Sequence, residues 1–225
     1  MARLLVHVEG QTEEGFVNEV LRDHLLARGY QSVAARLIGN ARRQGGIPSW
    51  AEARRDIIGH LRDDPACIAT TMVDYYGLPA RGGRAWPGRE EAALLRSEQR
   101  AQRVEDALRD DVIAAVGDAR RFVPFVVMHE FEGLLFSDCE AFSRGIERPD
   151  LAADLQMIRD RFPTPEDIND SLLTAPSKRV QNLVPRYQKP LLGVRAAQEI
   201  GLNRIRQECR HFDEWLTRLE AAASF

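Results

Sequence analysis

Few features of this sequence point to a secreted or membrane-spanning protein. Its 225 residues include three cysteines, which are widely separated and form no C-x-x-C pair: Cys67, Cys139 and Cys209. An odd and scattered set of this kind argues against a disulfide framework and against a zinc site. No apolar run approaches the length of a membrane span, and the amino terminus lacks the pattern of a signal peptide. We therefore expect a cytoplasmic protein with no membrane partner.

An excess of positive charge is also missing. The chain carries 31 lysine and arginine residues against 34 aspartate and glutamate residues, which gives a net charge of -3. A protein that coats DNA by itself is normally clearly basic, so any contact with nucleic acid has to come from local basic patches or from a partner. Hydrophobic residues make up 44% of the chain. Composition and length together suit one α/β domain, alone or with a small appended subdomain.

The chain opens with a strand-like run that ends in a carboxylate. Leu4–Val8 is apolar and predicts a buried strand, Glu9 follows it, and Gly10 permits a sharp turn. Thr12 is the predicted N-cap of an amphipathic helix that extends to about residue 27. Ligands bind at the carboxyl edge of open α/β sheets, which would place Glu9 in a site. The alternative is that Glu9 is an ordinary polar residue that closes a strand.

Two later strands are predicted to end in the same way. One leads into Asp74, and the other leads through His129 into Glu130. If a helix starts at His129, Glu130 and Glu132 lie on different faces of it, so at most one of them is expected in a shared site. Glu130 is favoured because it is nearer the strand end, and His129 is given at most a supporting position.

The remaining expected elements follow from periodicity and from capping residues. They are a strand at Val33–Ile38, a helix capped by Ser49 that ends near Asp63, a strand at Cys67–Val73, a charged helical region from Glu90 to about Val116, a strand at Phe122–Met128 with an edge position or a bulge at Pro124, and a helical carboxyl-terminal region with Trp215 in the core.

Carboxylates that meet at one sheet edge define the expected chemistry. Glu9, Asp74 and Glu130 would repel one another strongly unless a positive charge lay between them. A hard divalent cation with oxygen ligands resolves this repulsion, and Mg²⁺ or Mn²⁺ fits. Such a cation also binds phosphate oxygens, so metal-assisted phosphodiester chemistry is the natural interpretation. Glu13, one helical turn after Glu9, could add a further ligand.

Three short segments combine basic residues with glycine, proline or serine and could contact phosphate groups. Their basic residues are Arg42 and Arg43, Arg81 and Arg84, and Lys178 and Arg179. Each segment could equally be a solvated surface, as charged segments usually are. Trp86, in the second segment, is either a base-stacking residue or a packing anchor. Ser177, in the third, could cap a short helix that points at an anion.

The motifs at the strand ends resemble those of a known family. Val8–Glu13 looks like the first motif of Toprim domains, which occur in topoisomerases, primases and the overcoming-lysogenization-defect (OLD) nucleases, and Val73–Gly77 falls where these proteins carry an Asp-x-Asp strand end. The whole chain is similar to a bacterial family of Toprim-like proteins described as a domain of unknown function (DUF 4276). That similarity lies in three stretches: His129–Glu132, Ser177–Arg179 and Cys209–Leu219.

The resemblance implies a fold and a domain arrangement. The fold class would be α/β: a Toprim-like, Rossmannoid three-layer sandwich with a central, mostly parallel sheet, followed by a helical C-terminal extension. Residues 1–140 would form the Toprim-like core. Residues 141–225 would form the helical extension, packed on the core as one compact unit.

The resemblance also implies roles for individual residues. Glu9 would be the general base or a metal ligand, and Lys178 would be a cation that stabilises the transition state. The candidate metal ligands are Glu9, Glu13, Asp74 and Glu130, with Glu132, His129 and Tyr76 as additional candidates. Tyr76 stands where Toprim proteins carry the second Asp of Asp-x-Asp. A two-metal arrangement would therefore need Glu130 or Glu132 in its place.

These implications give one leading hypothesis, with two alternatives. The first is a Mg²⁺- or Mn²⁺-dependent nuclease that acts on DNA or RNA with a separate ATPase of the AAA or ABC type, in a role such as phage defence. The second is a catalytically weak module that binds nucleic acid or regulates, favoured by Tyr76 and the acidic net charge. The third is a receiver-like phosphoacceptor with Asp74 as the phosphorylated residue. A homodimer is left open.

Overall fold

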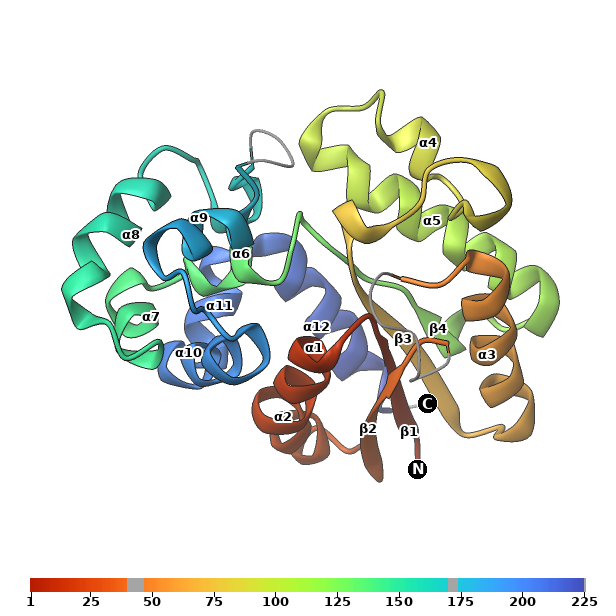
Figure 1. Cartoon of the computed structure of the whole chain (residues 1–225). Helices are drawn as coiled ribbons and strands as arrows, with labels where there is room; N and C mark the ends of the chain where they lie inside the picture. The colour runs from red at the N-terminus through yellow and green to blue at the C-terminus, as the bar shows by residue number, and fades with distance from the viewer. Residues whose placement is uncertain (40–46, 170–173, 225) are drawn as a thin grey trace.

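The computed structural model describes residues 1–39, 47–169 and 174–224. Among these residues, five strands form a sheet in which all strand pairings are parallel. The strands are β1 (Arg3–Val8), β2 (Ser32–Leu37), β3 (Cys67–Asp74), β4 (Phe122–Val123) and β5 (Val126–Val127). Their order is β2-β1-β3-β4, and β5 pairs with the carboxyl end of β3. The predicted α/β class with a parallel sheet is confirmed (Figure 1).

Helices occupy most of the remaining chain. Their bounds are α1 (Gln11–Phe16), a π-helical turn (Val17–Leu21), α2 (Arg22–Ala27), α3 (Trp50–Asp63), α4 (Arg89–Ala92), α5 (Ser97–Val116), α6 (Glu132–Leu135), α7 (Cys139–Gly145), α8 (Ala152–Arg159), α9 (Pro176–Leu183), α10 (Val194–Ile200), α11 (Leu202–Glu208) and α12 (Arg210–Ala222). Within the ranges that the structure describes, none of them combines the length and apolar character needed to cross a membrane.

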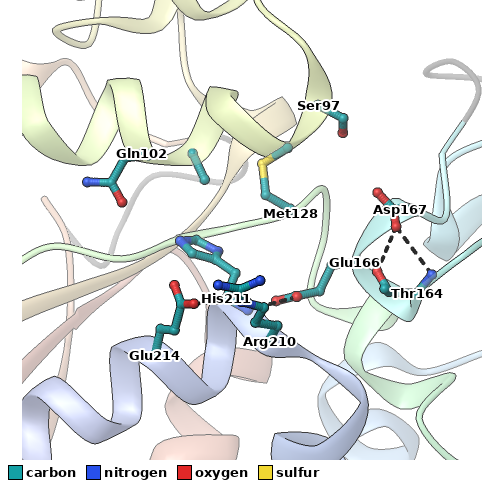
Figure 2. Close-up of a pocket in the computed structure, with 10 residues that line it drawn as sticks. Ser97, Gln102, Met128, Thr164, Glu166, Asp167, Arg210, His211 and Glu214 are labelled. Carbon is teal, nitrogen blue, oxygen red and sulfur yellow. Dashed lines mark hydrogen bonds and ion pairs between the residues drawn. The ribbon is translucent and has the colours of Figure 1, made fainter.

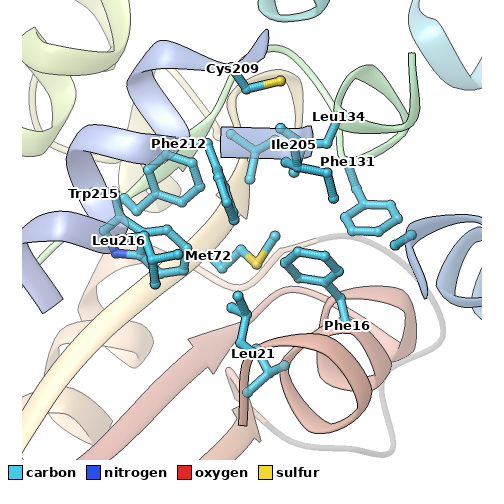
Figure 3. Close-up of a cluster of buried hydrophobic side chains, with 14 of the residues drawn as sticks. Phe16, Leu21, Met72, Phe131, Leu134, Ile205, Cys209, Phe212, Trp215 and Leu216 are labelled. Carbon is cyan, nitrogen blue, oxygen red and sulfur yellow. The ribbon is translucent and has the colours of Figure 1, made fainter. Parts of the chain in front are cut away.

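The sheet separates two hydrophobic clusters. On one face, Ile57 of α3 and Val104 of α5 pack with Val73 of β3. On the other face, Phe16 of α1 and Trp215 of α12 pack with Met72, as Figure 3 shows. Because adjacent residues of a strand point to opposite faces, Val73 packs in the first of these clusters and Met72 packs in the second. The molecule is a three-layer sandwich, with α6 to α11 gathered at one side of it (Figure 1).

Helix α12 belongs to the core of the sandwich. The indole of Trp215 stacks on Phe125, with ring centroids 4.4 Å apart and an interplanar angle of 9°. Its Nε1 donates a hydrogen bond of 2.9 Å to Oγ1 of Thr70 in β3. The prediction that Trp215 is a core residue is confirmed, because it is fully buried. The predicted boundary near residue 140 stays a prediction, and the last helix beyond it covers one face of the sheet.

Two local details differ from the sequence expectation and one agrees with it. The first helix begins at Gln11, so Thr12 is not its N-cap; the Glu13 carboxylate instead accepts a 3.0 Å hydrogen bond from the backbone N–H of Gly10. The single strand expected at Phe122–Met128 is split into β4 and β5, with Pro124 in the break. Ser49 caps α3 as expected, in a reciprocal arrangement with Glu52.

A buried carboxylate links α5, β5 and α12. Glu105 is fully buried and accepts a 2.9 Å hydrogen bond from the backbone N–H of Val126. Its oxygens also lie 2.9 Å from Nε2 of His211 and 3.5 Å from a guanidinium nitrogen of Arg218. Burial alone would lower the pKa of His211, but the charge and hydrogen bond of Glu105 together with the charge of Glu166 outweigh burial and raise this pKa. The folded structure therefore favours the imidazolium form of His211 more than the unfolded chain does.

The His211 pair predicts a pH-dependent contribution to stability. The charged groups that face His211 are Glu105 from α5, Glu166 from the Pro165–Asp167 turn and Arg218 from α12. Because the pKa of His211 is higher in the folded state than in the unfolded state, protonation of His211 stabilises the fold. This stabilisation is complete below the unfolded pKa of about 6.5, and it is lost as the pH rises through the folded pKa. We expect the free-energy difference of unfolding between wild type and His211→Gln, measured in urea, to be larger at about pH 6 than at about pH 9. A difference that is constant or grows with pH would contradict this assignment.

Candidate active site

The register of the sheet brings three predicted carboxylates to one edge. Val8 at the end of β1 is level with Met72 of β3, and Asp74 at the end of β3 is level with Val127 of β5. Glu9 therefore emerges beside Asp74, and its Oε2 accepts a 3.3 Å hydrogen bond from the backbone N–H of Asp74. Glu130 follows β5 by three residues at the same edge.

The turn after β3 leaves space for the Glu9 carboxylate. Gly77 ends a short 3-10 turn at Tyr75–Gly77. A Cβ atom built on Gly77 would lie 2.7 Å from Oε2 and 2.8 Å from Oε1 of Glu9. Real Cβ atoms do not approach oxygen that closely, so any side chain at position 77 would displace Glu9. Glycine at this position lets the Glu9 carboxylate lie against the backbone.

The other carboxylates of the edge are also held by backbone N–H groups. Oδ1 of Asp74 accepts from the N–H of Phe131 at 3.0 Å. Oε2 of Glu130 accepts from the N–H of Ser177 at 3.0 Å, at the start of α9. Each of these bonds fixes the direction of one carboxylate through one of its oxygens, and leaves lone pairs of the same group for another partner.

Glu132 joins the same site although only one of the two glutamates near β5 was expected there. Helix α6 begins at Glu132 and not at His129, so Glu130 precedes the helix and the two carboxylates are not constrained to different helix faces. Both act electrostatically on Asp74. Glu132 is 1% exposed, which makes it the most deeply buried carboxylate of the edge.

The positive charge that pairs with Glu132 comes from Lys189, a residue that the sequence analysis did not identify. Nζ of Lys189 lies 3.0 Å from Oε1 and 3.1 Å from Oε2 of Glu132. Burial would lower the pKa of Lys189, but Glu132, Glu130 and Asp74 outweigh it and raise this pKa. Lys189 therefore stays charged within the site.

Lys178, the predicted cation, directly follows Ser177, whose backbone N–H binds Glu130, but the ammonium group of Lys178 bonds a residue of its own helix. Lys178 is exposed, and its Nζ donates a 3.2 Å hydrogen bond to Oε1 of Gln181 on the same helix. Lys178 and Lys189 are the two lysines of a chain whose other basic residues are all arginine. The scarcity of lysine was the sequence signal that could have drawn attention to Lys189.

The electrostatics of the edge favour a bound cation. Burial is the main cause that raises the pKa of Asp74 well above its ordinary value, and four glutamates reinforce it. Burial, together with the charges of Glu9 and Glu132, raises the pKa of Glu13 to about 7. The pKa values of Glu9 and Glu132 are raised in the same direction, again chiefly by burial. Carboxylates that resist ionisation together are stabilised when a divalent cation enters.

Five carboxylates and one ammonium group thus act on one another electrostatically at this edge: Glu9, Glu13, Asp74, Glu130 and Glu132 with Lys189. An all-oxygen donor set of this kind suits Mg²⁺ or Mn²⁺. Within the part of the chain that the structure describes, no three histidine, cysteine, aspartate or glutamate side chains already form a metal shell. The match between these carboxylates and a divalent cation therefore rests on donor chemistry and charge. Binding of the ion would draw the mutually repelling carboxylates together.

Tyr76 and His129 form an aromatic wall beside the carboxylates. Their ring centroids are 5.4 Å apart with an interplanar angle of 30°, and the Tyr76 hydroxyl contacts the Asn169 side chain. His129 is 2% exposed, and burial lowers its pKa to about 4. Its Nε2 lies 3.4 Å from Oγ of Ser97. His129 is thus a neutral group at the border of the site.

The predicted phosphate-contacting residues have mixed outcomes. Arg42 and Arg43 lie outside the described residues. Arg81 and Arg84 are exposed, and Arg81 forms a 2.7 Å ion pair with Glu90. Arg179 donates a 2.7 Å hydrogen bond to the carbonyl oxygen of Thr174.

Trp86 is a packing residue and not a base-stacking surface. It is 1% exposed, and its Nε1 donates a 3.1 Å hydrogen bond to the carbonyl oxygen of Pro48. Its ring also lies against that of Trp50, with centroids 5.1 Å apart. The base-stacking alternative is therefore wrong, because a buried indole cannot meet a nucleobase.

Comparison with known proteins places these residues in a family. A family model described as "Domain of unknown function (DUF4276)" matches residues 8–220. No curated protein matches the chain. One solved structure that is similar to it is the C-terminal region of the OLD protein of Xanthomonas campestris pv. campestris. The two chains are 16% identical, the match covers 100% of this chain and 97% of that one, and the TM-score is 0.47.

Proposed function

The chain belongs to the DUF4276 family, and we propose that it is a Mg²⁺- or Mn²⁺-dependent phosphodiesterase that cleaves DNA or RNA. The observation that carries this proposal is the grouping of five carboxylates with one half-buried lysine at the carboxyl edge of a parallel sheet. That edge is where open α/β folds bind their ligands. Carboxylates alone would repel a phosphate, so this donor set suits phosphate chemistry only with a cation present.

The carboxylates would hold the ion, with Glu9, Asp74 and Glu130 supplying the edge positions and Glu13 and Glu132 lying next to them. When bound, a divalent cation supplies charge that stabilises phosphate oxygens and lowers the pKa of water. Glu9 is suited to accept a proton from an attacking water, because its carboxylate is held against the Tyr75–Gly77 turn and burial raises its pKa.

Lys189 would stabilise the negative charge that develops on a cleaved phosphodiester. Its ammonium group is anchored by Glu132, which fixes its position and leaves a donor for another partner. A preorganised cation of this kind is more effective in a buried site than in water. Lys189 would take the role that the family resemblance implies for Lys178.

The chain has no net positive charge that would attract nucleic acid to the site. The net charge of -3 is unfavourable for long-range attraction of a polyanion. We include in the proposal a separate ATPase chain of the AAA or ABC type that brings DNA or RNA to the site, and phage defence as the setting.

The experiment that tests this function is a cleavage assay. Supercoiled DNA, linear DNA and structured RNA would be incubated with the protein and Mg²⁺ or Mn²⁺, with and without an ATPase encoded beside it. We expect cleavage of at least one substrate that depends on the divalent ion and stops with EDTA. No cleavage under any condition, together with no Mn²⁺ binding, would instead support a catalytically weak binding or regulatory module, the alternative favoured by Tyr76 in place of a second acidic residue and by the acidic net charge.

A further inference from the structure

A cavity of about 320 Å³ lies between three parts of the chain (Figure 2). Helix α5 forms one wall, the start of α12 forms the opposite wall, and the Thr164–Asp167 segment closes one side. Met128 and Ala101 provide apolar lining, while most other lining residues are polar. The volume is at the small end of the range for ligand pockets, about 300–1,000 Å³, so it suits one ring system better than an extended ligand.

The cavity adjoins the carboxylate site. Met128, which lines it, precedes Glu130 by only two residues along the segment that leaves β5. Ser97, which also lines it, has its Oγ 3.4 Å from Nε2 of His129. A nucleotide whose phosphate lay at the carboxylates would therefore have its sugar and base within reach of this cavity.

The charges that line the cavity are largely neutralised by partners within the protein. Arg210 pairs with Glu214 at 2.8 Å, and His211, which also lines the cavity, pairs with Glu105 at 2.9 Å. Glu166 accepts two hydrogen bonds of 3.0 Å, from the backbone N–H groups of His211 and Phe212. What remains for a ligand is a set of carboxylate oxygens with further lone pairs. These oxygens would repel a phosphate and would accept N–H groups from an uncharged ligand.

We propose that this cavity receives one unpaired nucleobase of the substrate strand and favours bases with an exocyclic amino group. Adenine, cytosine and guanine present such donors, while thymine and uracil lack them. The apolar lining of Met128 and Ala101 suits the face of the base, and Glu166, Asp167 and Glu214 suit its amino edge. The inference rests on the proposed function, since it assumes that a nucleic-acid phosphate lies at the carboxylates.

Binding of short single strands tests the proposal without cleavage. Fluorescently labelled strands of deoxycytidine, deoxyadenosine or thymidine would be titrated with the full chain in Ca²⁺, with strand integrity checked on a gel. We expect the cytidine and adenosine strands to bind about tenfold more tightly than the thymidine strand, as hydrogen bonds to a base edge can provide. Glu214→Gln should reduce this preference, and Ala101→Leu, which fills the cavity, should abolish it.

The control variant is Glu199→Gln, an exposed glutamate of α10 that lies outside the cavity lining. It should keep the full preference, and thermal unfolding would verify that each variant is folded. Equal affinity for all three strands in wild type, or a preference that survives in folded Ala101→Leu, would overturn the inference. Metal-dependent cleavage with no base preference would overturn it while leaving the phosphodiesterase proposal standing. A preference without cleavage would support the cavity and count against the catalytic proposal.

Discussion

Asp74→Asn is expected to lower the rate of metal-dependent cleavage by about 10³-fold or more, because a metal ion in such a site contributes several kcal/mol of charge stabilisation. Asn keeps a side-chain oxygen for the Phe131 N–H, so the local hydrogen bond of Asp74 survives. What the substitution removes is the charge at the centre of the cluster, where four glutamates act on it. The measurement is single-turnover cleavage at saturating enzyme.

The same variant should not lose stability when no metal is present. Burial and the neighbouring glutamates raise the pKa of Asp74, which means that its charged form opposes folding. Neutral asparagine removes that opposition, so the midpoint of thermal unfolding in EDTA should be equal to or above that of wild type. Asp150→Asn, an exposed aspartate paired with Arg148, is the matched control and should leave cleavage unchanged. Wild-type cleavage by Asp74→Asn would contradict the assignment of this carboxylate.

Lys189→Met is expected to slow cleavage by about 10²- to 10³-fold, the usual loss when one preorganised transition-state partner is removed. The side chain of methionine has similar length, but it leaves Glu132 without the ammonium group that lies 3.0 Å away. Lys178→Met is the control. Lys178 is exposed and bonded to Gln181, so its loss should change the rate by less than about twofold, as is typical of surface substitutions.

Metal affinity separates a catalytic role of Lys189 from a structural one. Removing a positive charge from among carboxylates makes the site more attractive to a cation. Lys189→Met should therefore bind Mn²⁺ at least as tightly as wild type while cleaving more slowly. If both cleavage and Mn²⁺ binding were lost, Lys189 would be needed to keep the site folded, and if Lys178→Met were the slower enzyme, the assignment made from the sequence would be restored.

The residues at the strand ends could be predicted because their position follows from local sequence. An apolar run followed by a carboxylate recurs at Glu9 and Asp74, and parallel strands end at one edge of a sheet. The position of Glu132 could not be predicted in the same way. Whether it shares a site with Glu130 depends on the residue at which α6 begins, and sequence patterns locate helix ends only to within a few residues.

Lys189 was missed for a different physical reason. It lies 57 residues beyond Glu132 in the chain, and tertiary packing alone brings the two together. No periodicity or spacing motif links them. The Glu105 cluster with His211 and Arg218 is similar, because its members come from α5 and α12 and their partnership exists only after the sheet is covered on both faces.

Calorimetric titration of Mn²⁺ into wild type and Asp74→Asn tests the central claim most directly, because it asks whether the carboxylates at the sheet edge hold a divalent cation. The proposed site predicts saturable binding to wild type and loss of that binding in Asp74→Asn, while the control Asp150→Asn binds as wild type does. No binding to wild type, or equal binding to wild type and Asp74→Asn, would contradict the assignment of this edge as a metal-dependent active site.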